Sequence, residues 1–119
     1  MNYKNQVGRF GEKLACQYLV KKGYKIINNN FRIGHKEIDI LAKLKEKIVF
    51  IEVKTRVGGS FDELVEAISR KKLEILKKAI NNYIFTNDLN EELVYLEVVL
   101  VRIRKAEKIA NIKHYKGLL

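Results

Sequence analysis

The hydrophobic and polar positions of the chain follow a helical period near its start and a strand-like period after it. Residues 5–22 place apolar side chains on one arc at helical spacing, and Gly23 follows as a stop at the C′ position. YKIIN at 24–28 predicts the beginning of a strand, and NNNFRIGHK at 28–36 is rich in turn residues. Residues 37–54 supply two more strands around KLKEK. We therefore expect one helix followed by three strands.

A second helical pattern comes after a flexible connection at VGGS. Ser60 and Glu63 have the spacing of a capping box that opens a short turn of helix, and Ser69 offers a second N-cap. The helix after Ser69 has an apolar stripe with its basic residues largely off it. Residues 94–104 and 109–115 have strand patterns. The order αβββαββ predicts an α/β fold with a central mixed β-sheet flanked by helices.

The stretch EIDILAKLKEKIVFIEVK carries charged residues where a buried strand usually has hydrocarbon. If residues 44–47 form a four-residue hairpin loop, a common length, then Asp39 lies opposite Glu52 and Glu37 lies opposite Lys54. Opposed side chains are close enough for two carboxylates to hold one hard cation. The simpler alternative is an exposed hairpin end with a weak ion pair. The run IVFI favours the site, because it is typical of a strand covered on both faces.

Glu12 is a third acidic candidate. It lies at the edge of the first helix's apolar arc, a place that lines a cleft more readily than it meets bulk water. Gly8 and Gly11 flank it inside the helix, each at a cost of roughly 1 kcal/mol relative to alanine. A close approach by neighbouring backbone or by a ligand would explain the two glycines. For Glu12 itself, an ordinary glutamate at the boundary of the apolar arc is an alternative of equal weight.

The composition narrows the classes of function. With 119 residues, of which 47% are hydrophobic, the chain can bury the core of one domain over residues 1–119. Cys16 is the only cysteine, and His35 and His114 are the only histidines, which excludes a disulfide framework and a usual Cys/His zinc site. We expect a reducing, cytoplasmic setting. Apolar runs fall far short of the roughly 20 residues of a membrane span, so we expect no membrane partner.

The charge balance points to a polyanionic partner. The formal net charge is +10, from 24 basic and 14 acidic residues, and nucleic acid is the leading candidate. Lysine outnumbers arginine, which suits contact with backbone phosphates more than the reading of base edges. A solvated helix face is the alternative for the basic residues near the acidic pair. The candidates for phosphate contacts are Arg56, Arg70, Lys71 and Lys72.

Four segments occur in a characteristic order: GRFGEKLACQYLVKKGYKIINNNFR, EIDILA, IVFIEVKTR and AISRKKLEILKKAINNYI. Through them the chain resembles, over roughly residues 6–84, the YraN-like family of the restriction-endonuclease-like PD-(D/E)xK superfamily, which also holds archaeal Holliday-junction resolvases. The resemblance implies a restriction-endonuclease-like fold and a metal-dependent site for phosphodiester cleavage. It assigns Asp39, Glu52 and Lys54 to the motif and Glu12 to the acid on the first helix.

The expected chemistry follows from that assignment. Asp39, Glu52 and the carbonyl of Val53 would hold Mg²⁺, or Mn²⁺ in its place. Glu12 would hold a second ion or orient the water of the first, and Lys54 would position the attacking water and offset negative charge. The expected partner is nucleic acid, with DNA favoured over RNA and structured or branched DNA favoured in particular. A homodimer is compatible with this expectation. The alternatives are a non-catalytic nucleic-acid-binding module of the same fold and a basic scaffold protein, which would leave the acids unexplained.

The chain departs from the superfamily pattern at three positions. Ile38 stands where the superfamily has proline, as it does in the YraN-like family. Lys36 replaces the glycine usual before EID. Glu97 replaces an aspartate of the late strand, at a position that we expect to be structural.

Overall fold

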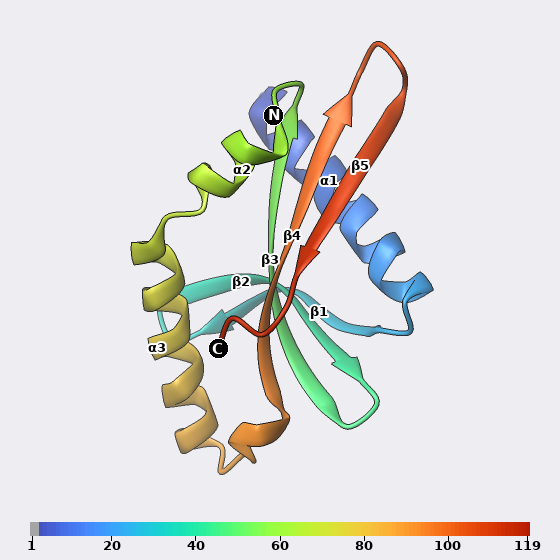
Figure 1. The fold of residues 1–119 in the computed structure, drawn as a ribbon. Helices are drawn as coiled ribbons and strands as arrows, with labels where there is room; N and C mark the ends of the chain where they lie inside the picture. The colour runs from blue at the N-terminus through green and yellow to red at the C-terminus, as the bar shows by residue number, and fades with distance from the viewer. Residues whose placement is uncertain (1–2) are drawn as a thin grey trace.

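The computed structural model describes residues 3–119, and within them one five-stranded sheet is combined with three α-helices (Figure 1). The elements in chain order are α1 (Tyr3–Lys21), β1 (Lys25–Ile33), β2 (Lys36–Leu44), β3 (Lys47–Val57), α2 (Phe61–Ala67), α3 (Arg70–Thr86), the 3₁₀ turn η1 (Glu91–Leu93), β4 (Val94–Arg104) and β5 (Ile109–Tyr115). None of the helices in residues 3–119 is long and apolar enough to cross a membrane.

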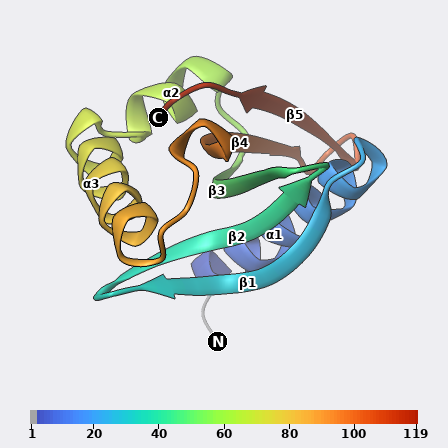
Figure 2. The same ribbon diagram turned by 90° about the horizontal axis from the view of Figure 1, so that it is seen from below.

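The sheet has the strand order β1-β2-β3-β4-β5 and is mixed. Only β3 and β4 run parallel, and the chain connects them through α2 and α3. The helix α1 covers one face of the sheet, and α2 and α3 cover the other (Figure 2). The predicted α/β class and mixed sheet are confirmed, and the arrangement is consistent with a restriction-endonuclease-like fold. The helical turn expected after VGGS is a full short helix, α2.

The core lies in two layers on either side of β3. Val49 and Ile51 pack beneath α1, while Phe50 packs beneath α3, and all three side chains are fully buried. The expectation that IVFI is covered on both faces is therefore confirmed. Because successive strand side chains point to opposite faces, one continuous apolar run supplies both layers.

Glycine sets the contact of α1 with the sheet. A Cβ at Gly11 would overlap the side chain of Thr55 on β3, so only glycine allows the helix to approach this strand. The close approach predicted at Gly11 is present, although the neighbour is a side chain. At Gly8 no neighbouring protein atom lies within 4 Å of a Cβ built there, so a close approach by neighbouring backbone does not explain this glycine. The predicted stop at Gly23 is confirmed by its φ of 97°.

The strand β1 extends further than the sequence suggests. NNNFRIGHK was expected to be turn-rich, yet β1 runs through it to Ile33, and the turn comes at Gly34 and His35. This edge strand keeps its asparagine side chains in solvent and absorbs a register shift between Ile26 and Asn28. Asparagine tolerates such irregular backbone better than most residues, so turn-forming composition here accompanies a distorted strand.

Helix caps and late strands follow their predictions. Ser60 accepts a hydrogen bond from the backbone N–H of Glu63, and Ser69 accepts one from that of Lys72. These two caps begin α2 and α3 at the expected residues. The strands β4 and β5 occupy the ranges predicted for them.

Candidate active site

The strands β2 and β3 pair regularly at one end and separate at the other. The pair Leu44–Lys47 closes the hairpin, so the loop has two residues, 45 and 46, and not the four expected. The pairs from there to Ile40–Ile51, the last in the ladder, confirm the predicted hairpin register. Beyond it the register would pair Glu37 with Lys54, and this part of the prediction is wrong, because the ladder ends. Within residues 3–119 these two side chains form no ion pair either.

The separation has its cause in the course of β2. Ile40 belongs to the core beneath α1, whereas Ile38 belongs to the core beneath α3. Residues two apart in a regular strand share a face, so the alternation of β2 breaks at Asp39. Asn30 lies between the residues of β1 that pair with Ile38 and Ile40, and its φ is 55°. The kink therefore crosses both strands and turns Asp39 into the gap beside β3.

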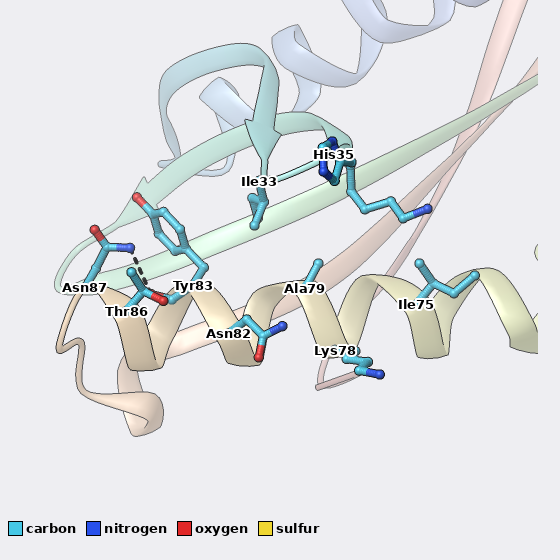
Figure 3. A pocket seen from close by; sticks show the side chains of 11 residues that line it. Ile33, His35, Ile75, Lys78, Ala79, Asn82, Tyr83, Thr86 and Asn87 are labelled. Atoms are coloured by element: carbon cyan, nitrogen blue, oxygen red, sulfur yellow. Dashed lines mark hydrogen bonds between the residues drawn. The ribbon is translucent and has the colours of Figure 1, made fainter.

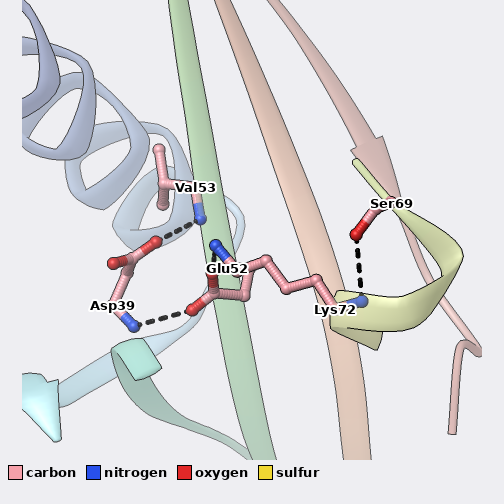
Figure 4. A network of polar contacts seen from close by, with 5 residues as sticks. All are labelled: Asp39, Glu52, Val53, Ser69 and Lys72. Carbon is pink, nitrogen blue, oxygen red and sulfur yellow. Dashed lines mark hydrogen bonds and ion pairs between the residues drawn. The ribbon is translucent and has the colours of Figure 1, made fainter. Parts of the chain in front are cut away.

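Side chains take the place of ladder hydrogen bonds in this gap. Glu52 Oε1 accepts a hydrogen bond of 3.2 Å from the backbone N–H of Asp39, and Asp39 Oδ2 accepts one of 2.7 Å from the backbone N–H of Val53 (Figure 4). The ammonium of Lys72, which reaches over from α3, lies 3.1 Å from Glu52 Oε2. The structure thus brings Asp39, Glu52 and Lys72 together, with Ser69 fixing the start of the helix that carries the lysine.

The two carboxylates are electrostatically strained. Burial raises the pKa of Asp39, and the hydrogen bond from Val53 and the charge of Lys72 offset this only in part. Burial also raises the pKa of Glu52, and the charge of Asp39 raises it further. Lys72 and the backbone of Asp39 act in the opposite direction without cancelling the shift. A cation between the carboxylates would relieve this cost.

Glu12 lies at the margin of this cluster. It is half-buried on α1, and its Oε1 accepts a hydrogen bond of 3.2 Å from the side-chain amide of Asn29 on β1. Burial raises the pKa of Glu12, the Asn29 bond lowers it, and the charges of Asp39 and Glu37 raise it further. Glu12 is therefore within electrostatic reach of Asp39.

The carboxylates of Asp39 and Glu52 fit a hard divalent cation that takes few of its ligands from the protein. In residues 3–119, no group of three or more His, Cys, Asp or Glu side chains is gathered closely enough to hold a metal ion. Mg²⁺ is nevertheless usually bound by one or two carboxylates and keeps several of its waters. Asp39 and Glu52 supply such a pair, and the second oxygen of Asp39 has no hydrogen-bond partner in the described part of the chain.

Lys54 lies beside the pair without contacting it. It follows Glu52 by two residues on the same face of β3 and lines the same hollow as Glu52 and Lys72. Its charge lowers the pKa of Asp39. The side chain is exposed and has no ion-pair partner among residues 3–119, so it can meet a molecule that approaches the carboxylates.

The four predicted phosphate contacts occupy different surroundings. Arg56 forms an ion pair of 3.3 Å with Glu63, Arg70 is exposed at the start of α3, and Lys71 lines a hollow next to Lys72. Sequence reasoning missed that Lys72 neutralises Glu52, and it missed the contact of Asn29 with Glu12. Both link segments far apart in the chain, and no local pattern signals them.

Comparison with known proteins gives a consistent family. The profile described as "Uncharacterised protein family UPF0102" matches residues 11–105. A UPF0102 protein of Alkaliphilus oremlandii is 39% identical over 117 residues, which cover 98% of each chain. One of Flavobacterium psychrophilum is 36% identical over 107 residues, which cover 90% of each chain. One of Carboxydothermus hydrogenoformans is 40% identical over 116 residues, 98% of this chain and 97% of that protein.

A solved structure is similar at a lower level. SfsA of Pyrococcus furiosus, in complex with Ca²⁺, matches with a TM-score of 0.44 and 16% identity. The match covers 96% of this chain and 64% of that chain. Similarity at this level supports no argument about the site.

Proposed function

The chain belongs to the UPF0102 family, the YraN-like proteins that its motifs resemble, and from this premise we propose that it is a metal-dependent nuclease that hydrolyses phosphodiester bonds in nucleic acid. The observation that carries the proposal is the pair Asp39 and Glu52 where β2 and β3 separate: Glu52 accepts a hydrogen bond from the backbone N–H of Asp39, and Asp39 accepts one from that of Val53. The formal charge of +10 supports a polyanionic substrate. Structured or branched DNA is the substrate class that we favour.

The metal site follows from the donors. Asp39 and Glu52, with the main-chain carbonyl of Val53, would hold Mg²⁺ or Mn²⁺, and Glu12 would hold a second ion or orient a water molecule. Such an ion supplies a water of lowered pKa and offsets charge on the phosphoryl oxygens. Because both carboxylates must be ionised to act as ligands, the role of Lys72 is to lower the pKa of Glu52 and keep it charged.

The lysine and arginine side chains act on the substrate. Lys54 would position the attacking water and offset the negative charge that grows on the phosphoryl oxygens in the transition state. Arg70 and Lys71, exposed at the beginning of α3, would contact phosphates on either side of the scissile bond. Arg56 would do so only by exchanging its ion pair with Glu63 for one with a phosphate.

The test is cleavage of a panel of labelled junctions, flaps, duplexes and single strands with Mg²⁺, with Mn²⁺ and with EDTA. We expect at least one substrate to be cut with metal and none with EDTA. Asp39→Asn should abolish cleavage, although an amide oxygen can still accept the hydrogen bond from Val53. The exposed Asp62→Asn on α2 is the matched control and should cut normally.

Lys54→Ala separates an enzyme from a binding module. Because its role lies in the transition state, its loss should lower the single-turnover rate by about 10²–10³-fold and leave substrate affinity nearly unchanged. Wild-type rates in a folded Lys54→Ala protein would remove the catalytic role. If the wild-type protein binds the panel and cuts nothing with either metal, the non-catalytic binding module is the better description.

A further inference from the structure

A groove leads from the carboxylates along α3. The hollow at Glu52 shares Lys72 with a second hollow between the start of β2 and α3, and the second shares Lys36 with a third. Neighbouring hollows thus share lining residues, and the three follow one another along α3. The last one, between the β1–β2 turn and the far half of α3, has a volume of about 550 Å³ (Figure 3).

The third hollow combines an apolar floor with a polar rim. Ile33 from β1 and Ala79 from α3 face each other across it, and His35 extends from the β1–β2 turn (Figure 3). Lys78 and Asn82 project from α3 at its edge. A floor that accepts flat apolar groups beneath a rim of cations and amides suits nucleobases with their phosphates on the outside.

The exposed edge of α3 also combines lysines with an apolar side chain. Lys71, Lys78 and Phe85 are spaced by seven residues, and positions seven apart drift by only about 20° around a helix. The three side chains therefore follow one edge of α3. Phe85 is 89% exposed. An aromatic ring left in water at the end of a row of lysines is suited to stacking on an unpaired base.

The charge along the groove is predominantly positive. The cations that line the second and third hollows are Lys36, Lys71, Lys72 and Lys78, of which Lys72 is paired with Glu52. Glu37 is the acid that faces the second hollow, and Glu74 on α3 is paired with Lys77 at 3.6 Å. This balance complements a phosphate backbone and opposes a basic or purely apolar partner.

We propose that this strand groove, from Lys72 to Phe85, holds an unpaired DNA strand that leads away from the scissile phosphate. The inference rests on the proposed nuclease function and specifies its substrate as a duplex with a single-stranded tail or a branch with an unpaired arm. From Lys71 to Phe85 the helix spans about 21 Å, room for about six stacked nucleotides at 3.4 Å each or fewer extended ones. A hollow of about 550 Å³ accommodates unpaired nucleotides but not a double helix.

The floor of the groove favours DNA over RNA. A ribose 2′-hydroxyl placed against Ile33, Ile75 or Ala79 would be buried without a hydrogen-bond partner, whereas deoxyribose has no such group.

The test is fluorescence anisotropy in EDTA, with one duplex in a blunt form and in a form that carries a single-stranded DNA tail. We expect the wild-type protein to bind the tailed form more tightly. Phe85→Ala should weaken tailed binding by at least about 5-fold, the low end of the stacking energy of one base, and leave blunt binding unchanged. Lys78→Ala should flatten the salt dependence of tailed binding by about 0.7 in slope. The matched controls are Phe10→Ala, half exposed on α1, and Lys43→Ala, exposed on β2.

Several outcomes would overturn the inference. Equal affinity for tailed and blunt duplexes would do so, as would equal losses in Phe85→Ala and Phe10→Ala. An affinity for the tail that does not change with salt would show that the lysines do not contact its phosphates. An RNA tail bound as tightly as the DNA tail would reject the choice of DNA. Because the assay contains no metal, it is independent of the cleavage panel. Tail preference without any cleavage would contradict the nuclease proposal alone, and cleavage without tail preference would contradict the strand groove alone.

Discussion

Two buried glutamates in neighbouring strands show how one residue type can serve opposite purposes. Glu52 on β3 is 8% exposed and Glu97 on β4 is 4% exposed. They lie on opposite faces of the sheet, Glu52 toward α3 and Glu97 toward α1, where it meets Tyr24. The pKa of Glu52 is raised, whereas that of Glu97 is lowered. Burial raises the pKa of both groups, and the hydrogen-bond partners of Glu97 are what reverse the direction there.

Glu97 is surrounded by hydrogen-bond donors. Burial raises its pKa, but bonds from His114 and Tyr24 outweigh this and leave the pKa below its ordinary value. The distances to Glu97 Oε1 are 2.7 Å from His114 Nε2 and 2.8 Å from the Tyr24 hydroxyl. Tyr18 in turn contacts His114 Nδ1 at 3.2 Å, so the ring is held from both sides. A carboxylate satisfied in this way stabilises the fold.

Glu52 instead has another acid as its neighbour. The fold could have surrounded it with donors, as it does Glu97, yet it places Asp39 beside it and leaves the repulsion only partly offset by Lys72. Strain of this kind is common where a site is kept ready for a ligand, because groups arranged for function are often suboptimal for stability. The comparison therefore indicates a structural role for Glu97 and supports the proposal that Glu52 has a functional one.

The largest effect should come from replacing each glutamate by glutamine and measuring cleavage of the best substrate under single-turnover conditions. Glu52→Gln should lower the rate by at least about 10²-fold, because it removes a charged ligand of the metal ion on which the proposed reaction depends. Glu97→Gln should cut at nearly the wild-type rate per folded molecule. Similar losses of rate in both variants would contradict a functional role that is specific to Glu52.

Metal binding should separate the same two variants in thermal melting. At a Mn²⁺ concentration 100-fold above its dissociation constant, the wild-type protein and Glu97→Gln should gain about 2.7 kcal/mol in unfolding free energy. Glu52→Gln should gain little, since one of the two carboxylates is lost. The control is the same titration with EDTA present. A full Mn²⁺ response in Glu52→Gln would show that the ion binds elsewhere.

Without metal the order of stability should reverse. Glu97→Gln should lose about 2 kcal/mol of unfolding free energy, since a buried charged acceptor for two donors becomes neutral. Glu52→Gln should be as stable as the wild-type protein or more so, because the repulsion with Asp39 is removed while an amide oxygen still accepts the bond from the backbone. Urea denaturation in EDTA measures both. A larger loss in Glu52→Gln than in Glu97→Gln would contradict the assignment of roles.

The sequence predicts the local features of this comparison but not the long-range ones. Hairpin register, helix caps and both late strands follow from short patterns of apolar, polar and capping residues. The break of alternation at Asp39 does not follow from such patterns. It depends on the packing of Ile38 and Ile40 from one strand into cores on opposite faces of the sheet. The partners of Glu97 lie 73 and 17 residues away in the chain. A lone acid inside VYLEVVLV signals a buried carboxylate, but not which residues satisfy it.

The smallest effect is the pH dependence of stability in the metal-free protein. The ordinary pKa of both glutamates is 4.5. For Glu52 the folded state has the higher pKa and holds its proton more tightly than the unfolded chain, so stability falls as pH rises from about 4.5 through the raised pKa. For Glu97 the folded state has the lower pKa, so its contribution is complete above 4.5 and is lost as pH falls through the lowered pKa.

Melting temperatures should be measured from about pH 3 to about pH 8, a range that includes the ordinary pKa of a glutamate. Over this range the curves of the two glutamine variants should diverge. Relative to wild type, Glu52→Gln should be unchanged in acid and increasingly stabilised as pH rises, whereas Glu97→Gln should be increasingly destabilised. The exposed Glu66→Gln on α2 is the control and should follow the wild-type curve. Mn²⁺ binds only ionised carboxylates, so adding it should reverse the sign for Glu52→Gln above the raised pKa and leave Glu97→Gln below wild type. Two parallel curves for the glutamine variants would mean that their surroundings do not distinguish the two glutamates.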